Sequence, residues 1–392
     1  MASLYVASNN ARKGVVVVLG VAVAIILIDT FIKIRNQTIL PPPSTRRFYL
    51  DADKALGDIK APNIPGIQVD IKNVTVDSIS PLAFPDVSYV YTIEEPREKS
   101  NTVENASLTA KNVGFTVVNL KQIGNNDYKW TTSDQSKTLN FNRLSQVWSF
   151  STIYENNVDA RKKKTMLPDI NSYIAKVPTV LGSLLFSTGF GFTSPKIDAR
   201  YIVRSDQGDI TETQDSKVAN YVKLNVYRKL ALADLKPQAD QPKLLTGEIK
   251  PQAVTGFVYK TDPRVGEFNA AVSNDLSNLS RDLFEMNFVN YTYGTKGIYQ
   301  IITPDEALTK VINGQGSLVA LAAEGTDYFE PYVKISVDNF IVDARKTELG
   351  FYEPDEWTGF AYPIYILNGR AKLTDGRLAS FTFYVDAIKR QT

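Results

Sequence analysis

The chain contains neither cysteine nor histidine among its 392 residues. Thiolates and imidazoles are the usual ligands of structural zinc, and they supply the nucleophile or the base in most triad-type hydrolases. Their absence excludes a zinc site of that kind, a Ser-His-Asp triad and a cysteine nucleophile. It also excludes disulfides, so the fold must depend on an apolar core. From the residues that remain, we predict no metal site and no cofactor site.

An excess of charge of either sign is also missing. Lys and Arg total 44 against 42 Asp and Glu, a formal net charge of +2. Nucleic-acid-binding proteins usually present a basic face, so the composition predicts no nucleic-acid partner. Hydrophobic residues make up 43% of the chain and charged residues 22%, which is typical of a folded globular protein.

One long apolar segment stands near the N-terminus. Residues 14–32 read GVVVVLGVAVAIILIDTFI, with Asp29 as the single charge. At about 1.5 Å per residue, a helix of this length spans about 28 Å, close to the bilayer core of about 30 Å. We therefore predict an N-terminal tail at 1–13 and an uncleaved transmembrane helix at 14–32, with the lipid bilayer as its partner.

The charges that flank this predicted anchor do not by themselves determine its orientation in the membrane. Arg12 and Lys13 precede the segment and Lys33 and Arg35 follow it, so the positive-inside rule is nearly balanced. The linker at 33–65 contains the run PPPST, which suits a stalk that holds a domain off a membrane. We predict a single-pass cell-membrane protein with its body on the extracytoplasmic side.

Hydrophobic periodicity divides the body into strands and a few helices. Alternation of apolar and polar residues predicts strands at 68–79, 87–93, 115–120, 128–131, 138–141, 148–154, 221–227, 253–259, 333–342, 348–352, 361–367 and 378–387. Helices are predicted at 102–113 and 168–188 and after Thr303. There, Thr303 and Glu306 match a capping box and Pro304 suits the first turn. Residues 374–377 (TDGR) predict a hairpin turn.

Both halves of the body therefore resemble a helix followed by an antiparallel sheet. The predicted fold class is α+β, with an N-terminal transmembrane helix followed by two helix-plus-antiparallel-sheet modules. The first module is expected at 66–160 and the second at 201–392. A linker and helix at 161–200, beginning with the basic run RKKK, separates them.

The C-terminal stretch carries a family resemblance. Its motifs are PDEAL at 304–308, NG at 313–314, LGFYEP at 349–354, YPIYI at 362–366 and FYVDA at 383–387. Together they resemble the PepSY-like extracytoplasmic module of YycH/YycI-type regulators of envelope sensor kinases. The layout of anchor, stalk and this ending is also similar to uncharacterised membrane-anchored bacterial envelope proteins. The resemblance implies PepSY-like modules and a binding or regulatory role rather than catalysis. Where the family usually has tryptophan, this chain has Tyr365.

Candidate catalytic arrangements are weak. Ser133 with Lys137, and Ser107 with Lys111, are four residues apart, whereas a Ser-x-x-Lys site needs a spacing of three. The segment DQGD at 206–209 lacks the alternating ligands and distal glutamate of a calcium loop. We therefore predict no catalytic residue and no enzyme activity.

A cluster of acidic and aromatic residues lies between two predicted strands. Glu353 and Asp355 precede Trp357 and Phe360, and we expect these four residues to contact a partner. The expected function is membrane-anchored, extracytoplasmic binding or regulation in the cell envelope, by non-covalent recognition of a protein or cell-wall partner. Two alternatives stay open: a cell-wall-active hydrolase that uses carboxylates near Glu353, and a passive structural surface protein.

Overall fold

The computed structural model describes residues 49–69, 73–77, 84–97, 102–116, 119–152, 166–184, 194–204, 210–234, 254–274, 276, 278–289, 291–323 and 336–390. Of two compact units in the chain, the one formed by Tyr49–Gln238 and Lys250–Thr392 contains all of these residues. The predicted anchor at 14–32, the PPPST run, the RKKK run and the 206–209 loop lie outside the described residues. Within the described ranges, no helix is both long and apolar enough to cross a bilayer.

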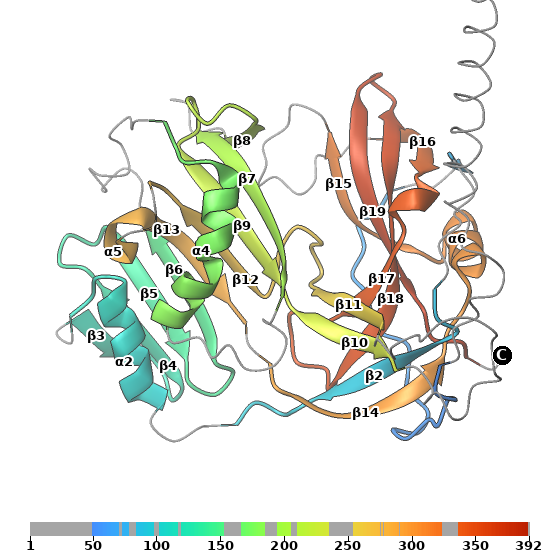
Figure 1. The fold of residues 1–392 in the computed structure, drawn as a ribbon, viewed down its shortest axis with the longest axis horizontal. Helices are drawn as coiled ribbons and strands as arrows, with labels where there is room; N and C mark the ends of the chain where they lie inside the picture. Colours follow the sequence, from blue (N-terminus) through green and yellow to red (C-terminus); the bar gives the residue numbers. More distant parts are fainter. Residues whose placement is uncertain are drawn as a thin grey trace, which may run out of the picture. The chain divides into compact units, whose positions relative to one another are not determined.

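Nine of the described strands form one wholly antiparallel sheet (Figure 1). In spatial order they are β3 (Leu120–Gln122), β4 (Asp127–Thr131), β5 (Lys137–Asn142), β6 (Val147–Thr152), β13 (Leu283–Phe288), β12 (Phe268–Val272), β9 (Tyr221–Tyr227), β7 (Lys196–Arg204) and β8 (Ile210–Thr213).

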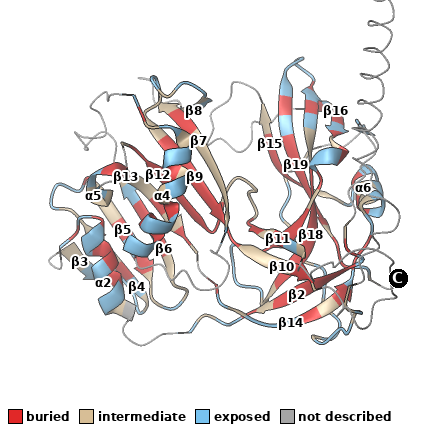
Figure 2. Ribbon diagram, in the orientation of Figure 1, coloured by how far each residue is buried: buried red, intermediate tan, exposed pale blue. Residues whose placement is uncertain are grey.

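Helices cover one face of this nine-stranded sheet. They are α2 (Thr102–Asn112) and α4 (Ile170–Ser183), and the one-turn α5 (Leu279–Asp282) leads into β13. Asp169 caps the start of α4 by accepting a hydrogen bond from the backbone of Asn171. The buried side chains of α2 and α4 pack with the inward residues of the strands in one core. Figure 2 shows the exposed residues of both helices on the side away from the sheet.

Ten described strands form the second sheet, which is mixed. It contains β1 (Val74–Val76), β16 (Val337–Val342), β18 (Phe360–Leu373), β17 (Glu348–Tyr352), β11 (Val254–Tyr259), β10 (Lys229–Ala233), β14 (Tyr293–Gln300), β2 (Val87–Ile93), β15 (Ser317–Ala323) and β19 (Leu378–Asp386). The β1–β16 and β11–β17 pairs are parallel, and the other pairs are antiparallel.

The strand β18 is the centre of the ten-stranded sheet. It pairs with β17 and β2 along its first part, with β16 along its second part and with β19 over most of its length. The helix α6 (Pro304–Ile312) contributes Ala307 and Val311 to the core of this sheet. The short 3-10 helix η3 (Ala344–Lys346) connects β16 to β17.

Several local predictions are confirmed. The capping box joins Thr303 and Glu306 in both directions, with Pro304 in the first turn. The turn at 374–377 joins β18 to β19, and Gly376 has a φ of +87°, a conformation that favours glycine. The helices α2 and α4 begin within two residues of the predicted starts. Of the strand predicted at 68–79, the described residues form only Val74–Val76.

The predicted fold class is wrong. The protein is mainly β, with two large sheets, and it does not consist of two helix-plus-sheet modules in succession. The described strands switch sheets after β2, β9, β11 and β13, so both sheets combine strands from both halves of the chain. For example, β6 pairs with β13, and β2 pairs with β14 and β18. Alternation in a sequence indicates that a strand exists, but it does not identify the strand's partner.

Candidate functional site

The face of the nine-stranded sheet opposite the helices is polar. On β9, Val222, Leu224 and Val226 enter the core, so Lys223 and Asn225 belong to the other face. Strand register aligns one polar residue from each of six strands across this face. This row, here called the amide row, consists of Asp198, Asn225, Asn269, Asn287, Ser149 and Asn140, from β7, β9, β12, β13, β6 and β5.

The amide row contains a buried side chain with unmet hydrogen-bonding capacity. Asn225 is fully buried, and neither its side-chain nitrogen nor its side-chain oxygen has a hydrogen-bond partner among the described residues. Its neighbour Asn269 accepts a long bond of 3.4 Å from Asn287. Because most buried polar atoms in native proteins are paired, an orphaned amide calls for an explanation. Leaving such a group unsatisfied costs about 1–3 kcal/mol.

A second row on the same face carries charge and aromatic rings. The Nζ atom of Lys223 lies 3.4 Å from a carboxylate oxygen of Glu285, and burial lowers the pKa of the lysine. At the end of β9, the ring of Tyr221 lies 6.5 Å from that of Phe284. Both rings are half-buried. Amide side chains, an ion pair and an aromatic pair therefore lie near one another on this face.

A cavity of about 380 Å³ lies over this part of the sheet, here called the polar cavity. Such a volume is within the range of small-ligand sites. Lys223, Asn269, Glu285 and Asn287 contribute from the sheet. The other lining residues come from the loop at 260–267, which joins β11 to β12, from Val289 after β13, and from Asp355.

The 260–267 loop is held firmly against the sheet. The carboxylate of Asp262 accepts hydrogen bonds from the backbone N–H of Arg264 and from its guanidinium, at 2.8–3.0 Å. At Gly266, an added Cβ would lie 2.3 Å from the carbonyl oxygen of Val226 on β9. Only glycine permits this approach, so the loop forms a fixed wall of the polar cavity.

Two buried ion pairs lie beside the polar cavity, where the chain passes between the sheets. The Nε atom of Arg228, which connects β9 to β10, lies 2.7 Å from Glu267 at the start of β12. The ammonium of Lys260, after β11, pairs with Glu353, after β17. All four side chains are at most 3% exposed. Lys260 and Glu267 also line the polar cavity.

Tyr293 on β14 links the two ion pairs. Its hydroxyl donates to Glu353 and lies 3.3 Å from a carboxylate oxygen of Glu267. We refer to Arg228, Lys260, Glu267, Tyr293 and Glu353 as the crossing cluster. Every charged member has a partner of opposite sign, as a buried charge requires.

Burial is the largest single influence on the pKa values of Glu267 and Arg228 in the crossing cluster. It raises the pKa of Glu267 to about 7, an effect that nearby Glu353 reinforces and that Arg228 and Lys260 oppose. For Arg228, burial opposes the charged form, but the carboxylates of Glu267 and Glu353 and the phenol of Tyr293 outweigh it and raise the pKa. The guanidinium therefore stays charged.

The four residues predicted to contact a partner occupy different environments. Glu353 is fully buried in the crossing cluster, whereas Asp355 is exposed and lines the polar cavity. The side chain of Trp357 is 43% exposed, and its indole N–H donates to the carbonyl of Ile93 at 3.0 Å. Phe360 begins β18 and is half-buried against Tyr362.

This geometry bears on the hydrolase alternative. One carboxylate oxygen of Glu353 binds Lys260 and the other accepts from Tyr293, and the side chain has no exposed surface. A general acid must reach the glycosidic oxygen of its substrate, and a fully buried carboxylate with both oxygens engaged does not.

The sequence contained a partial signal for the amide row. The segment YVKLNVY alternates, which places its asparagine on the face opposite the core valines. The segments FNAAV and LFEMNF each contain one asparagine among apolar residues, but the sequence analysis assigned them no strand. The alignment of these asparagines depends on register between strands far apart in the chain, which a single sequence does not specify.

Comparison with known proteins adds little to this description. No protein-family model matches the chain, and no curated protein matches it. Among solved structures, it is similar to the crystal structure of an uncharacterized protein from Eubacterium rectale. The identity is 10%, the match covers 78% of this chain and 86% of that chain, and the TM-score is 0.38. A score at this level supports no inference about fold or function. The PepSY-like resemblance therefore stays a prediction.

Proposed function

We propose that this chain is a non-covalent binding protein and that the polar cavity receives a neutral, hydroxyl-rich ligand such as the saccharide part of a cell-wall polymer. The observation that carries this proposal is the pair of side-chain amides of Asn269 and Asn287, which line the cavity beside the buried Asn225. An asparagine side chain offers two donor hydrogens and an acceptor oxygen. A sugar hydroxyl both donates and accepts, so it matches a row of amides.

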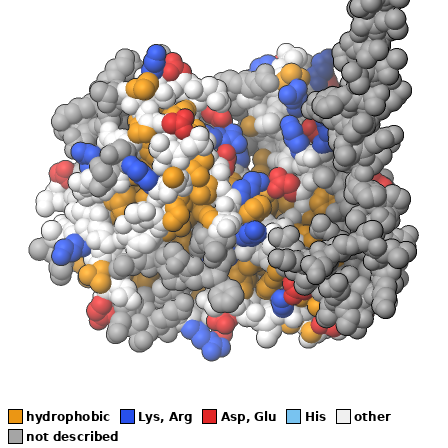
Figure 3. All heavy atoms as spheres, in the orientation of Figure 1, with side chains coloured by type: hydrophobic (Ala, Val, Ile, Leu, Met, Phe, Trp, Pro, Cys, Tyr) orange, Lys and Arg blue, Asp and Glu red, His pale blue; other side chains and the backbone are white. Residues whose placement is uncertain are grey.

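The charge balance of the cavity favours a neutral ligand over an ionic one. Lys223 is paired with Glu285, Lys260 with Glu353 and Arg264 with Asp262. Because the cations already have carboxylate partners, an anionic ligand would have to displace one of these partners. Figure 3 shows the same intermixing of basic and acidic side chains over the face in view.

The cellular setting of this proposal comes from the sequence. An extracytoplasmic body, and a protein or cell-wall partner in the envelope, stay predictions. Protease digestion of a C-terminal tag in intact cells, with lysed cells as control, tests the location. Digestion in intact cells supports an extracytoplasmic body, and protection until lysis contradicts it.

The binding proposal is tested by calorimetric titration of the full chain with two soluble probes, chitotriose and cellotriose. We expect saturable binding of at least one probe. Replacement of Asn287 by leucine keeps the side-chain size and removes the amide, and should weaken binding at least tenfold. Asn140→Leu is the matched control, because Asn140 belongs to the same row but lies outside the cavity. It should change affinity less than twofold. Absence of binding to both probes, or equal effects of the two variants, would overturn the proposal.

A further inference from the structure

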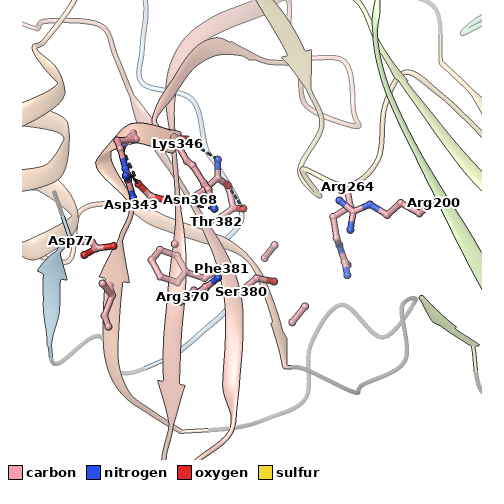
Figure 4. Close-up of a pocket in the computed structure, with 15 residues that line it drawn as sticks. Asp77, Arg200, Arg264, Asp343, Lys346, Asn368, Arg370, Ser380, Phe381 and Thr382 are labelled. Carbon is pink, nitrogen blue, oxygen red and sulfur yellow. Dashed lines mark hydrogen bonds and ion pairs between the residues drawn. The ribbon is translucent and has the colours of Figure 1, made fainter. Parts of the chain in front are cut away.

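A second and larger cavity lies over the ten-stranded sheet. Its volume is about 760 Å³, and most of its lining comes from neighbouring strands of that sheet. Figure 4 shows Asn368, Arg370, Ser380 and Thr382 projecting from β18 and β19. We call this the basic cavity, because Arg200, Arg264, Arg345, Lys346 and Arg370 line it against two acidic residues, Asp77 and Asp343.

Small side chains create the space over these strands. One register row across the sheet contains Ala322 on β15, Ser380 on β19 and Arg370 on β18. The arginine therefore has two short side chains beside it on the neighbouring strands. In the adjoining strand position, Gly369 allows β16 to approach. A Cβ there would lie 2.2 Å from the carbonyl oxygen of Ile341. The two short side chains of Ala322 and Ser380 therefore leave space beside Arg370.

Most of the cations that line the basic cavity have internal partners. Arg345 and Lys346 share Asp343, at 3.4 and 3.7 Å. Figure 4 places Arg200 and Arg264 side by side, across the cavity from the strand residues. These two pair with acidic residues near them in the chain, Arg200 with Asp198 and Arg264 with Asp262.

Arg370 differs from these residues. It is exposed, and no hydrogen bond or ion pair from any described residue reaches its guanidinium. Ser380 stands directly opposite it on β19. One step along the strands, Thr382 donates to Asn368 at 2.8 Å, and Asn368 donates to the carbonyl of Lys346 at 3.1 Å. These bonds hold the surrounding polar groups in place while the guanidinium fork stays available.

We propose that the basic cavity binds an anionic ligand through carboxylate or phosphate oxygens, with Arg370 as its main contact and Ser380 as a hydroxyl donor. A guanidinium offers two parallel N–H groups that match both kinds of oxyanion. Arg345 and Lys346 on η3 add positive potential at the rim, since they share one carboxylate. This site is independent of the polar cavity, although Arg264 lines both.

Calorimetric titration of the full chain with inorganic pyrophosphate and with citrate tests this site and distinguishes the two oxyanions. We expect saturable binding of at least one of them. Arg370→Gln should weaken that binding at least tenfold, equal to about 1.4 kcal/mol. It should leave the response to chitotriose and cellotriose unchanged, which separates this site from the proposed saccharide site.

Lys372→Gln is the matched control. Lys372 lies two residues further along β18, is exposed, and does not line the cavity. This variant loses the same charge, so it should change affinity less than twofold. Failure of both anions to bind the native chain would overturn the proposal. An equal loss in the two variants would also overturn it, because binding would then follow net charge alone.

Discussion

The charged side chains of the crossing cluster and Asn225 of the amide row are all buried and polar, yet they differ in how completely they are paired. In the crossing cluster, Arg228 and Lys260 each face a carboxylate, and Tyr293 bridges the two acids. In the amide row, Asn225 has no partner for either of its polar atoms. A fully paired network specifies one arrangement of the strands that meet in it. The unpaired amide of Asn225 specifies no such arrangement, and its row neighbours Asn269 and Asn287 are the amides that line the polar cavity.

The largest expected effect comes from breaking a pair in the crossing cluster. Glu353→Ala leaves the ammonium of Lys260 buried without a counter-charge, and it should lower the free energy of unfolding by about 3–5 kcal/mol. Urea unfolding followed by circular dichroism measures this loss. The control is Glu212→Ala, which removes a half-exposed partner of Arg200 and should cost less than about 1 kcal/mol. A loss below 1 kcal/mol for Glu353→Ala would show that the cluster does not hold the sheets.

The next largest effect is a dependence of the free energy of unfolding on pH. Burial raises the pKa of Glu267 to about 7 from an ordinary value of 4.5, so the folded protein binds this proton more tightly than the unfolded chain does. Its contribution to stability is fully present below pH 4.5 and is lost as the pH rises through 7. The loss amounts to about 3 kcal/mol. Urea midpoints between pH 4.5 and 8 measure it.

Glu267→Gln removes this titration. The difference in unfolding free energy between the native chain and the variant should therefore change by about 3 kcal/mol over that range. A difference that stays constant with pH would show that Glu267 titrates at its ordinary value. A difference that favours the native chain increasingly at high pH would reverse the sign of the argument.

A smaller effect, of opposite sign, is expected in the amide row. Asn225→Leu removes two unpaired polar atoms at nearly constant volume and should raise the free energy of unfolding by about 1–2 kcal/mol. Urea unfolding measures this change. Destabilisation by more than 1 kcal/mol would mean that the amide of Asn225 supports the fold.

The smallest effect on stability is expected at Trp357. Its exposed ring adds little to the core, and its single hydrogen bond to Ile93 is worth about 1 kcal/mol. Trp357→Ala should therefore lower stability by about 1 kcal/mol while reducing binding to purified cell-wall fragments in a sedimentation assay. Trp357→Phe is the control, since it keeps an aromatic surface and loses only the N–H donor. Unchanged binding in Trp357→Ala would remove this residue from the proposed binding surface.

The candidate site was only partly visible in the sequence. Glu353 and Asp355 cluster with Trp357 in the sequence, and the structure brings both to the neighbourhood of the polar cavity. Their roles differ because Glu353 is buried against Lys260, a residue 93 positions away, whereas Asp355 faces the cavity. The sequence does not identify Lys260, Glu267 or Arg228 as neighbours of Glu353, since Lys260 and Glu267 lie in the β11–β12 connection and Arg228 lies in the β9–β10 connection.

Local features of this protein were determined by the sequence alone. The Thr303–Glu306 capping box, the glycine turn after β18 and the alternation of β9 depend on residues within a few positions of one another, and the structure confirms each of them. The membrane environment of the apolar segment at 14–32, which lies outside the described residues, stays a prediction from its length. Only the tertiary structure decided which strands pair, and hence that two large sheets replace the expected modules. Register between distant strands is set by the packing of the whole core, and that register alone aligns the amide row and joins the buried ion pairs.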